Sequence, residues 1–190
     1  MDAYTLSQPY GYTYTSISLP RMLYGSEIWS LSKTEMEMLE RTHRKILRTI
    51  QGLPVRCPKE GIGTLLGCPT IADLISRKKL SFLLSIVALP NAVLPKQVLQ
   101  RRLQEPNAKA WISLLEAQMD ELNLPGVATL MQNTPSKSCW KRCITKILGT
   151  RAYLHLLDQA EIKSDLEQLS MCEPNFLVPS PIWGVKYVLR

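Results

Sequence analysis

The sequence lacks the short motifs that mark the common enzyme classes. It contains no Gly-x-Gly-x-x-Gly, no Gly-Lys-Ser/Thr phosphate loop, no Gly-x-Ser-x-Gly and no His-Glu-x-x-His. Histidine is scarce, with His43 and His155 the only two, and local spacing places no Asp, Cys or Ser partner beside His43. We therefore expect a core role for His43, and we expect a protein that is not an enzyme and needs no cofactor.

Membrane, export and metal signals are missing as well. The longest apolar run, residues 80–90, is far too short to span a bilayer, and residues 1–18 have no basic segment followed by an apolar core. The five cysteines are odd in number and widely spread: Cys57, Cys68, Cys139, Cys143 and Cys172. This pattern favours reduced thiols and no metal site. We expect a soluble, intracellular protein without a membrane partner, and the sequence leaves nucleus or cytoplasm open.

Charge is unevenly distributed along the chain. The net charge is +7, and residues 1–102 contain 14 Lys and Arg against 7 Asp and Glu, whereas residues 103–190 contain 9 of each kind. The whole excess of positive charge therefore lies in the first half. Such a surplus suits a polyanionic partner, and RNA, DNA or an RNA–DNA hybrid is the first candidate.

The first half contains one amphipathic helix with clear start and stop signals. A short apolar strand is predicted over residues 23–29, and the Ser32/Glu35 spacing of a capping box predicts a helix from Lys33 that ends before Gly52. The apolar stripe of that helix is formed by Met36, Leu39, His43, Ile46, Leu47 and Ile50. The opposite face is basic and contains Arg41, Arg44, Lys45 and Arg48, with Arg56 nearby.

This order of elements resembles one particular region of a known family. The residues Leu23, Tyr24, Gly25, Glu27 and Trp29 form an LYG-x-E-x-W pattern. The helix then supplies a second group of matching positions, which are Leu39, Glu40, Arg44, Leu47, Arg48, Ile50 and Gly52. Together they resemble the segment just after the polymerase palm in non-LTR retrotransposon reverse transcriptases. The resemblance implies a helical thumb that supports the polymerase cleft and contacts nucleic acid, and it becomes loose beyond about Leu89.

The catalytic part of such an enzyme is not present in this sequence. The family's palm would contain paired aspartates that bind two metal ions, upstream of the LYG segment. The chain has no Asp-Asp pair, and only 22 residues precede Leu23. The resemblance therefore implies a truncated, retroelement-derived protein that does not polymerise.

The predicted fold class is mostly α, a thumb-like bundle of six to seven helices with a short N-terminal strand or extended segment. Residues 1–22 are expected to be a flexible leader and residues 23–104 a basic thumb-like region. A second, charge-neutral helical region is predicted over 107–170, with a break near Gly149, followed by a loose tail over 171–190.

Two functions remain open from the sequence. One is salt-sensitive binding to the RNA or DNA backbone through the basic residues Arg41, Arg44, Lys45, Arg48 and Arg56. However, Glu37 and Glu40 precede Arg41 and Arg44 by four residues, so the same face also fits an ordinary solvated helix surface with local ion pairs. The alternative function is a helical protein-interaction module, or self-association through an exposed apolar helix face.

Overall fold

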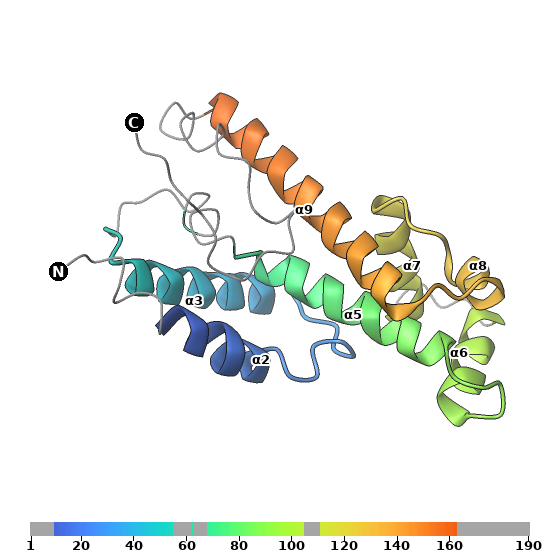
Figure 1. Cartoon of the computed structure of the whole chain (residues 1–190). Coiled ribbons are helices and arrows are strands. Elements are labelled where there is room, and N and C mark those ends of the chain that lie inside the picture. The colour runs from blue at the N-terminus through green and yellow to red at the C-terminus, as the bar shows by residue number, and fades with distance from the viewer. Residues whose placement is uncertain (1–9, 55–61, 63–67, 105–110, 163–190) are drawn as a thin grey trace. The chain divides into compact units, whose positions relative to one another are not determined.

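The chain is mostly helical, as predicted. The structure is a computed structural model and describes residues 10–54, 62, 68–104 and 111–162. Figure 1 shows the elements: η1 (Tyr14–Ser18), α2 (Leu19–Met22), α3 (Lys33–Gln51), α5 (Ile71–Val87), α6 (Leu94–Gln104), α7 (Trp111–Glu121), α8 (Val127–Gln132) and α9 (Lys137–Ile162). These described residues contain no β-strand. The predicted tail over 171–190 lies outside them.

The helices belong to two compact units. One unit combines the described residues of 10–24, 31–74 and 148–162, and the other combines 25–30 and 75–147. Each unit is therefore assembled from segments distant in sequence, in contrast to the consecutive regions predicted over 23–104 and 107–170. These segments are joined by long-range packing. The distribution of charge along the sequence, on which the predicted regions were based, contains no information about that packing.

Helix α3 begins and ends where its sequence signals place it. The Ser32 hydroxyl accepts a hydrogen bond from the Glu35 backbone N–H at 3.3 Å, and the Glu35 carboxylate accepts one from the Ser32 N–H at 2.8 Å. These hydrogen bonds hold the pKa of Glu35 below its usual value. At the other end Gly52 has φ +64°, the left-handed conformation that glycine adopts most easily. The predicted helix is confirmed by both caps.

A buried histidine ties the N-terminal residues to α3 in the first unit. The Tyr14 hydroxyl lies 2.6 Å from Nδ1 of His43, and Nε2 of His43 lies 3.3 Å from the carbonyl oxygen of Pro69. A carbonyl only accepts, so Nε2 carries the proton and the Tyr14 hydroxyl donates to Nδ1. The expected core role of His43 fits this geometry. Residues 10–22, within the segment for which we expect a flexible leader, are helical because Tyr14 and Leu19 are buried.

The short strand predicted over residues 23–29 is wrong. Residues 23–28 form consecutive turns instead. Gly25 has φ +75°, and the Ile28 N–H donates to the Gly25 carbonyl at 3.0 Å, which closes a turn within the segment. The apolar residues of this stretch resembled a strand, but among the described residues no neighbouring strand exists with which it could pair.

The second unit has a continuous apolar core. Its buried residues from α5 to α9 include Leu80, Leu83, Leu84, Val87, Leu99, Ile112, Leu115, Met119, Val127, Leu130, Trp140 and Ile144. Two polar contacts fix the packing: the Trp140 indole N–H donates to the Leu80 carbonyl at 3.0 Å, and the Gln118 amide donates to the Ser76 hydroxyl. The apolar 80–87 segment is buried within this unit, where the Leu80 carbonyl contacts Trp140 of α9.

Helix α9 is continuous through Gly149, where we predicted a break. A glycine inside a helix costs about 1 kcal/mol relative to alanine. Gly149 itself is buried, and Ile144 and Leu148 beside it are buried as well, so packing offsets this cost. No helix among the described residues has the length and apolar character needed to cross a membrane.

Candidate nucleic-acid interface

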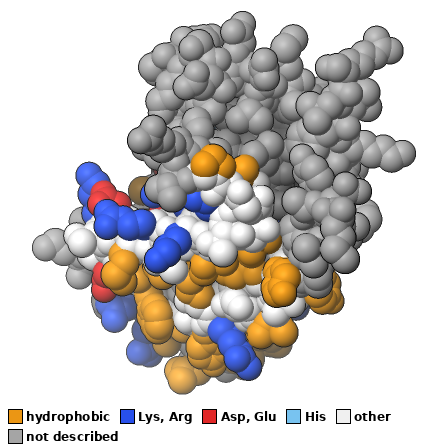
Figure 2. All heavy atoms as spheres, turned by 90° about the vertical axis from the view of Figure 1, so that its left-hand side faces the viewer, with side chains coloured by type: hydrophobic (Ala, Val, Ile, Leu, Met, Phe, Trp, Pro, Cys, Tyr) orange, Lys and Arg blue, Asp and Glu red, His pale blue; other side chains and the backbone are white. Residues whose placement is uncertain are grey.

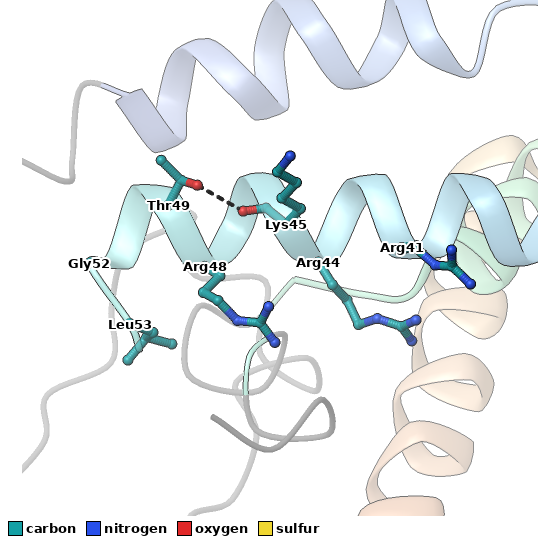
Figure 3. Close-up of a pocket in the computed structure, with 7 residues that line it drawn as sticks. All are labelled: Arg41, Arg44, Lys45, Arg48, Thr49, Gly52 and Leu53. Carbon is teal, nitrogen blue, oxygen red and sulfur yellow. Dashed lines mark hydrogen bonds between the residues drawn. The ribbon is translucent and has the colours of Figure 1, made fainter. Parts of the chain in front are cut away.

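The four predicted basic residues of α3 lie along one side of the helix. At 3.6 residues per turn, Arg41, Arg44, Lys45 and Arg48 fall within an arc of about 100° and span about 10 Å of helix axis. Figure 3 shows the side chains of Arg44 and Arg48 extending from one edge of this arc and Lys45 from the other edge. We call these four residues the basic face.

The basic face borders a hollow of about 690 Å³ in the surface. Besides the four cations, Thr49, Gly52 and Leu53 line it, all from the end of α3 and the residue that follows the cap. The Thr49 hydroxyl already donates to the Lys45 carbonyl at 3.0 Å. Thr49 and Leu53 were not among the binding residues predicted from the sequence. Their spacing from Lys45 and Arg48 along the helix could have indicated them.

The local ion pairs that would neutralise the basic face do not form. Glu40 lies four residues before Arg44, but its carboxylate accepts a hydrogen bond from the Ala72 backbone N–H at 3.1 Å. Within the described ranges, no acidic side chain comes within salt-bridge distance of Arg41, Arg44 or Lys45. The interpretation of this face as a set of i, i+4 ion pairs is therefore not supported by the geometry.

Exposure divides the four cations into two kinds. Arg41 and Lys45 are exposed, whereas Arg44 and Arg48 are half-buried. The positive charge of Arg44 reaches the interior, since it adds to the effect of burial in lowering the pKa of His43. Arg41 and Lys45 are consequently the two positions at which charge can be changed with the least disturbance of packing.

Figure 2 views the molecule from the side at which α3 ends. On the described part of this face, Lys and Arg side chains are more abundant than acidic ones and are interspersed with apolar patches. A surface of this composition attracts polyanions through its field rather than through a single contact. Arg56, the fifth predicted basic residue, lies outside the described residues.

The residues of the LYG-x-E-x-W pattern lie in, and directly after, the turns over residues 23–28. Leu23 is buried in the first unit, and Tyr24 is 80% exposed. In the second unit, a Cβ added at Gly25 would lie 3.4 Å from the Trp29 indole, so glycine permits both the positive φ and this close approach. The Glu27 carbonyl accepts a hydrogen bond from the Trp111 indole at 2.8 Å. Leu23, Gly25 and Glu27 thus take part in packing, and Gly52 ends α3.

The described part of the chain contains no larger cluster of side chains that could bind a metal ion. No group of three or more His, Cys, Asp or Glu side chains lies there in a position to hold an ion. Comparison of the chain with protein-family models, with curated proteins and with solved structures gives no match.

Proposed function

We propose that the protein is a non-catalytic, retroelement-derived chain that binds the backbone of RNA or DNA through the basic face of α3. One observation carries this proposal: four cations share one side of a well-capped helix, and three of them have no acidic partner among the described residues. The resemblance to the region after the palm of non-LTR reverse transcriptases points in the same direction, and the absence of an Asp-Asp pair argues against polymerase activity.

The dimensions of the basic face suit a phosphate backbone. Its length of about 10 Å corresponds to about three steps of 3.4 Å per nucleotide along a strand, and therefore to roughly four phosphates. The described residues that line it include no aromatic ring on which a base could stack. The contacts available are therefore charge contacts to phosphate, which position a nucleic acid without reading its sequence.

Fluorescence anisotropy of labelled RNA, DNA and hybrid duplexes tests this proposal. If four cations contact phosphates, the slope of log K against log salt should be about −3.6, and affinity should fall about 100-fold between 50 and 200 mM salt. Arg41→Gln/Lys45→Gln should halve this slope to about −1.8. The absence of binding at low salt by a folded sample would contradict the proposal.

The chain offers a matched control for this variant. Lys141 and Arg142 of α9 are likewise one lysine and one arginine, both exposed on a helix. Lys141→Gln/Arg142→Gln removes the same net charge from a place outside the basic face. If both variants weakened binding equally, the binding would depend on net charge alone and the assignment to α3 would be wrong.

The alternative is a helical protein-interaction module. Apolar residues that would serve it are exposed on α6 and α7, with Leu94 at 70%, Val98 at 47% and Leu114 at 50%. The apolar faces of the 80–87 and 111–122 segments are two further candidates for such contacts, but most of their apolar residues are buried inside the second unit. Apolar association is insensitive to moderate salt, so self-association that persists at high salt, without nucleic-acid binding, would favour this alternative.

A further inference from the structure

Two cysteines of α9 share one exposed helix face. Cys139 and Cys143 are free and exposed, and they are separated by four residues within an unbroken helix. Side chains at this spacing are neighbours, with Cβ atoms about 5–6 Å apart. Neither thiol forms a hydrogen bond with another side chain among the described residues. The hydrogen bond from Cys139 to the Ser136 hydroxyl is donated by the backbone N–H and leaves the thiol unused.

We propose that Cys139 and Cys143 form a two-thiolate site for a soft monovalent cation, of which Cu(I) is the biological example. Thiolates select soft metals, and Cu(I) is satisfied by two sulfur ligands on opposite sides of the ion. With metal–sulfur bonds near 2.3 Å, the two sulfurs would lie about 4–5 Å apart. That separation fits side chains whose Cβ atoms are one helical turn apart.

The surroundings of the two thiols suit a singly charged cation better than zinc. Zinc in structural sites takes four protein ligands, and the described residues contain no third His, Cys, Asp or Glu close enough to join this pair. A Cu(I) ion bound by two thiolates has a net charge of −1. Arg142 and Lys146 are exposed and lie three residues after Cys139 and Cys143, so they flank the pair with positive charge.

Binding would proceed without oxidation or reduction. One Cu(I) ion and two thiols give one bis-thiolate complex and release two protons to solvent, and the copper enters and remains as Cu(I). This site is independent of the basic face of α3 and of the proposed binding to nucleic acid.

Anaerobic titration with Cu(I), in competition with a chromophoric Cu(I) chelator, tests the proposal on the full chain. Cys57→Ser/Cys172→Ser provides the background, because the remaining thiol, Cys68, is buried. We expect one Cu(I) per chain, bound by a monomer, with the simultaneous loss of two reactive thiols. Because the second ligand binds intramolecularly, Cys139→Ser or Cys143→Ser should each weaken binding by about 100-fold or more.

A register control separates the proposed pair from the mere presence of two thiols. Lys141→Cys/Cys143→Ser keeps two exposed thiols on α9 but places them about 200° apart around the helix. This variant should bind Cu(I) as weakly as the single-thiol variants, with an unchanged circular dichroism spectrum. The proposal is overturned if the register control binds as tightly as the native pair. Copper-dependent dimers, or Zn²⁺ binding of equal affinity, would overturn it as well.

Discussion

The hydrogen bond between Tyr14 and His43 provides the sharpest test of how the N-terminal helical residues are held. Replacing Tyr14 by phenylalanine keeps the ring but removes the hydroxyl that donates to Nδ1 of His43 at 2.6 Å. Both side chains are buried, Tyr14 at 5% and His43 at 2% exposed. The variant leaves a buried acceptor without its donor, which costs about 1–3 kcal/mol of unfolding free energy.

Urea unfolding at pH 7.5, followed by circular dichroism, measures this cost. Tyr12 supplies the matched control, since it lies two residues earlier in the same helical segment but is 60% exposed. Tyr12→Phe should change the free energy of unfolding by less than about 0.5 kcal/mol. If Tyr14→Phe were as stable as Tyr12→Phe, the hydrogen bond would contribute nothing and the assigned packing of residues 10–22 on α3 would be refuted.

The same contact has a defined pH dependence. Burial lowers the pKa of His43, the hydrogen bond to the Pro69 carbonyl opposes this, and the charge of Arg44 lowers the pKa further. Burial raises the pKa of Tyr14 to about 12, and the charges of Cys68 and Glu40 add to this effect.

Because the folded-state pKa of His43 is depressed, the unfolded chain binds a proton more readily below pH 6.5. Stability should therefore be complete above pH 6.5 and fall below it by up to about 1.4 kcal/mol per pH unit, until the folded-state pKa is reached. His43→Gln should remove this component from the pH profile. An identical profile in the variant would contradict the lowered pKa, because it would show that His43 binds protons equally in the folded and unfolded chain.

Three further outcomes follow from the structure. Ser32→Ala removes the side-chain cap of α3 and should lower the free energy of unfolding by about 1 kcal/mol, measured by urea denaturation; an unchanged value would mean that the capping box does not form. Asp73→Ala removes the carboxylate that accepts a hydrogen bond from the Thr70 hydroxyl at the start of α5 and that pairs with Arg151 of α9. The change should lower the free energy of unfolding by about 2–4 kcal/mol in the same assay. A loss below about 1 kcal/mol would contradict the pairing of Asp73 with Arg151. In the Cys57→Ser/Cys172→Ser background, a thiol reagent should label two thiols in the native chain, since burial raises the pKa of Cys68 to about 11; three labelled thiols before unfolding would contradict the packing around Cys68.

The segment from Leu23 to Trp29 shows what a sequence pattern can predict and what it cannot. Gly25 and Trp29 were recognised as members of one motif, and the structure explains their spacing by the packing of the indole on the glycine. The predicted secondary structure of the segment was wrong, because a short apolar stretch becomes a strand only when a neighbouring strand forms hydrogen bonds with its backbone. Instead, the Glu27 carbonyl is satisfied by the Trp111 indole, 84 residues away in sequence.

By itself, the sequence determined α3: its first residue, its last residue and the position of its four cations around the axis. Each of these depends on residues no more than four positions apart, through the Ser32 cap, the left-handed Gly52 and the helical period. Tertiary structure alone decided that Arg44 has no acidic partner among the described residues, since Glu40 turns to the Ala72 N–H, 32 residues away. It likewise kept α9 helical through Gly149. Local signals fix the ends of a helix, whereas the partner of a side chain depends on which distant segment packs beside it.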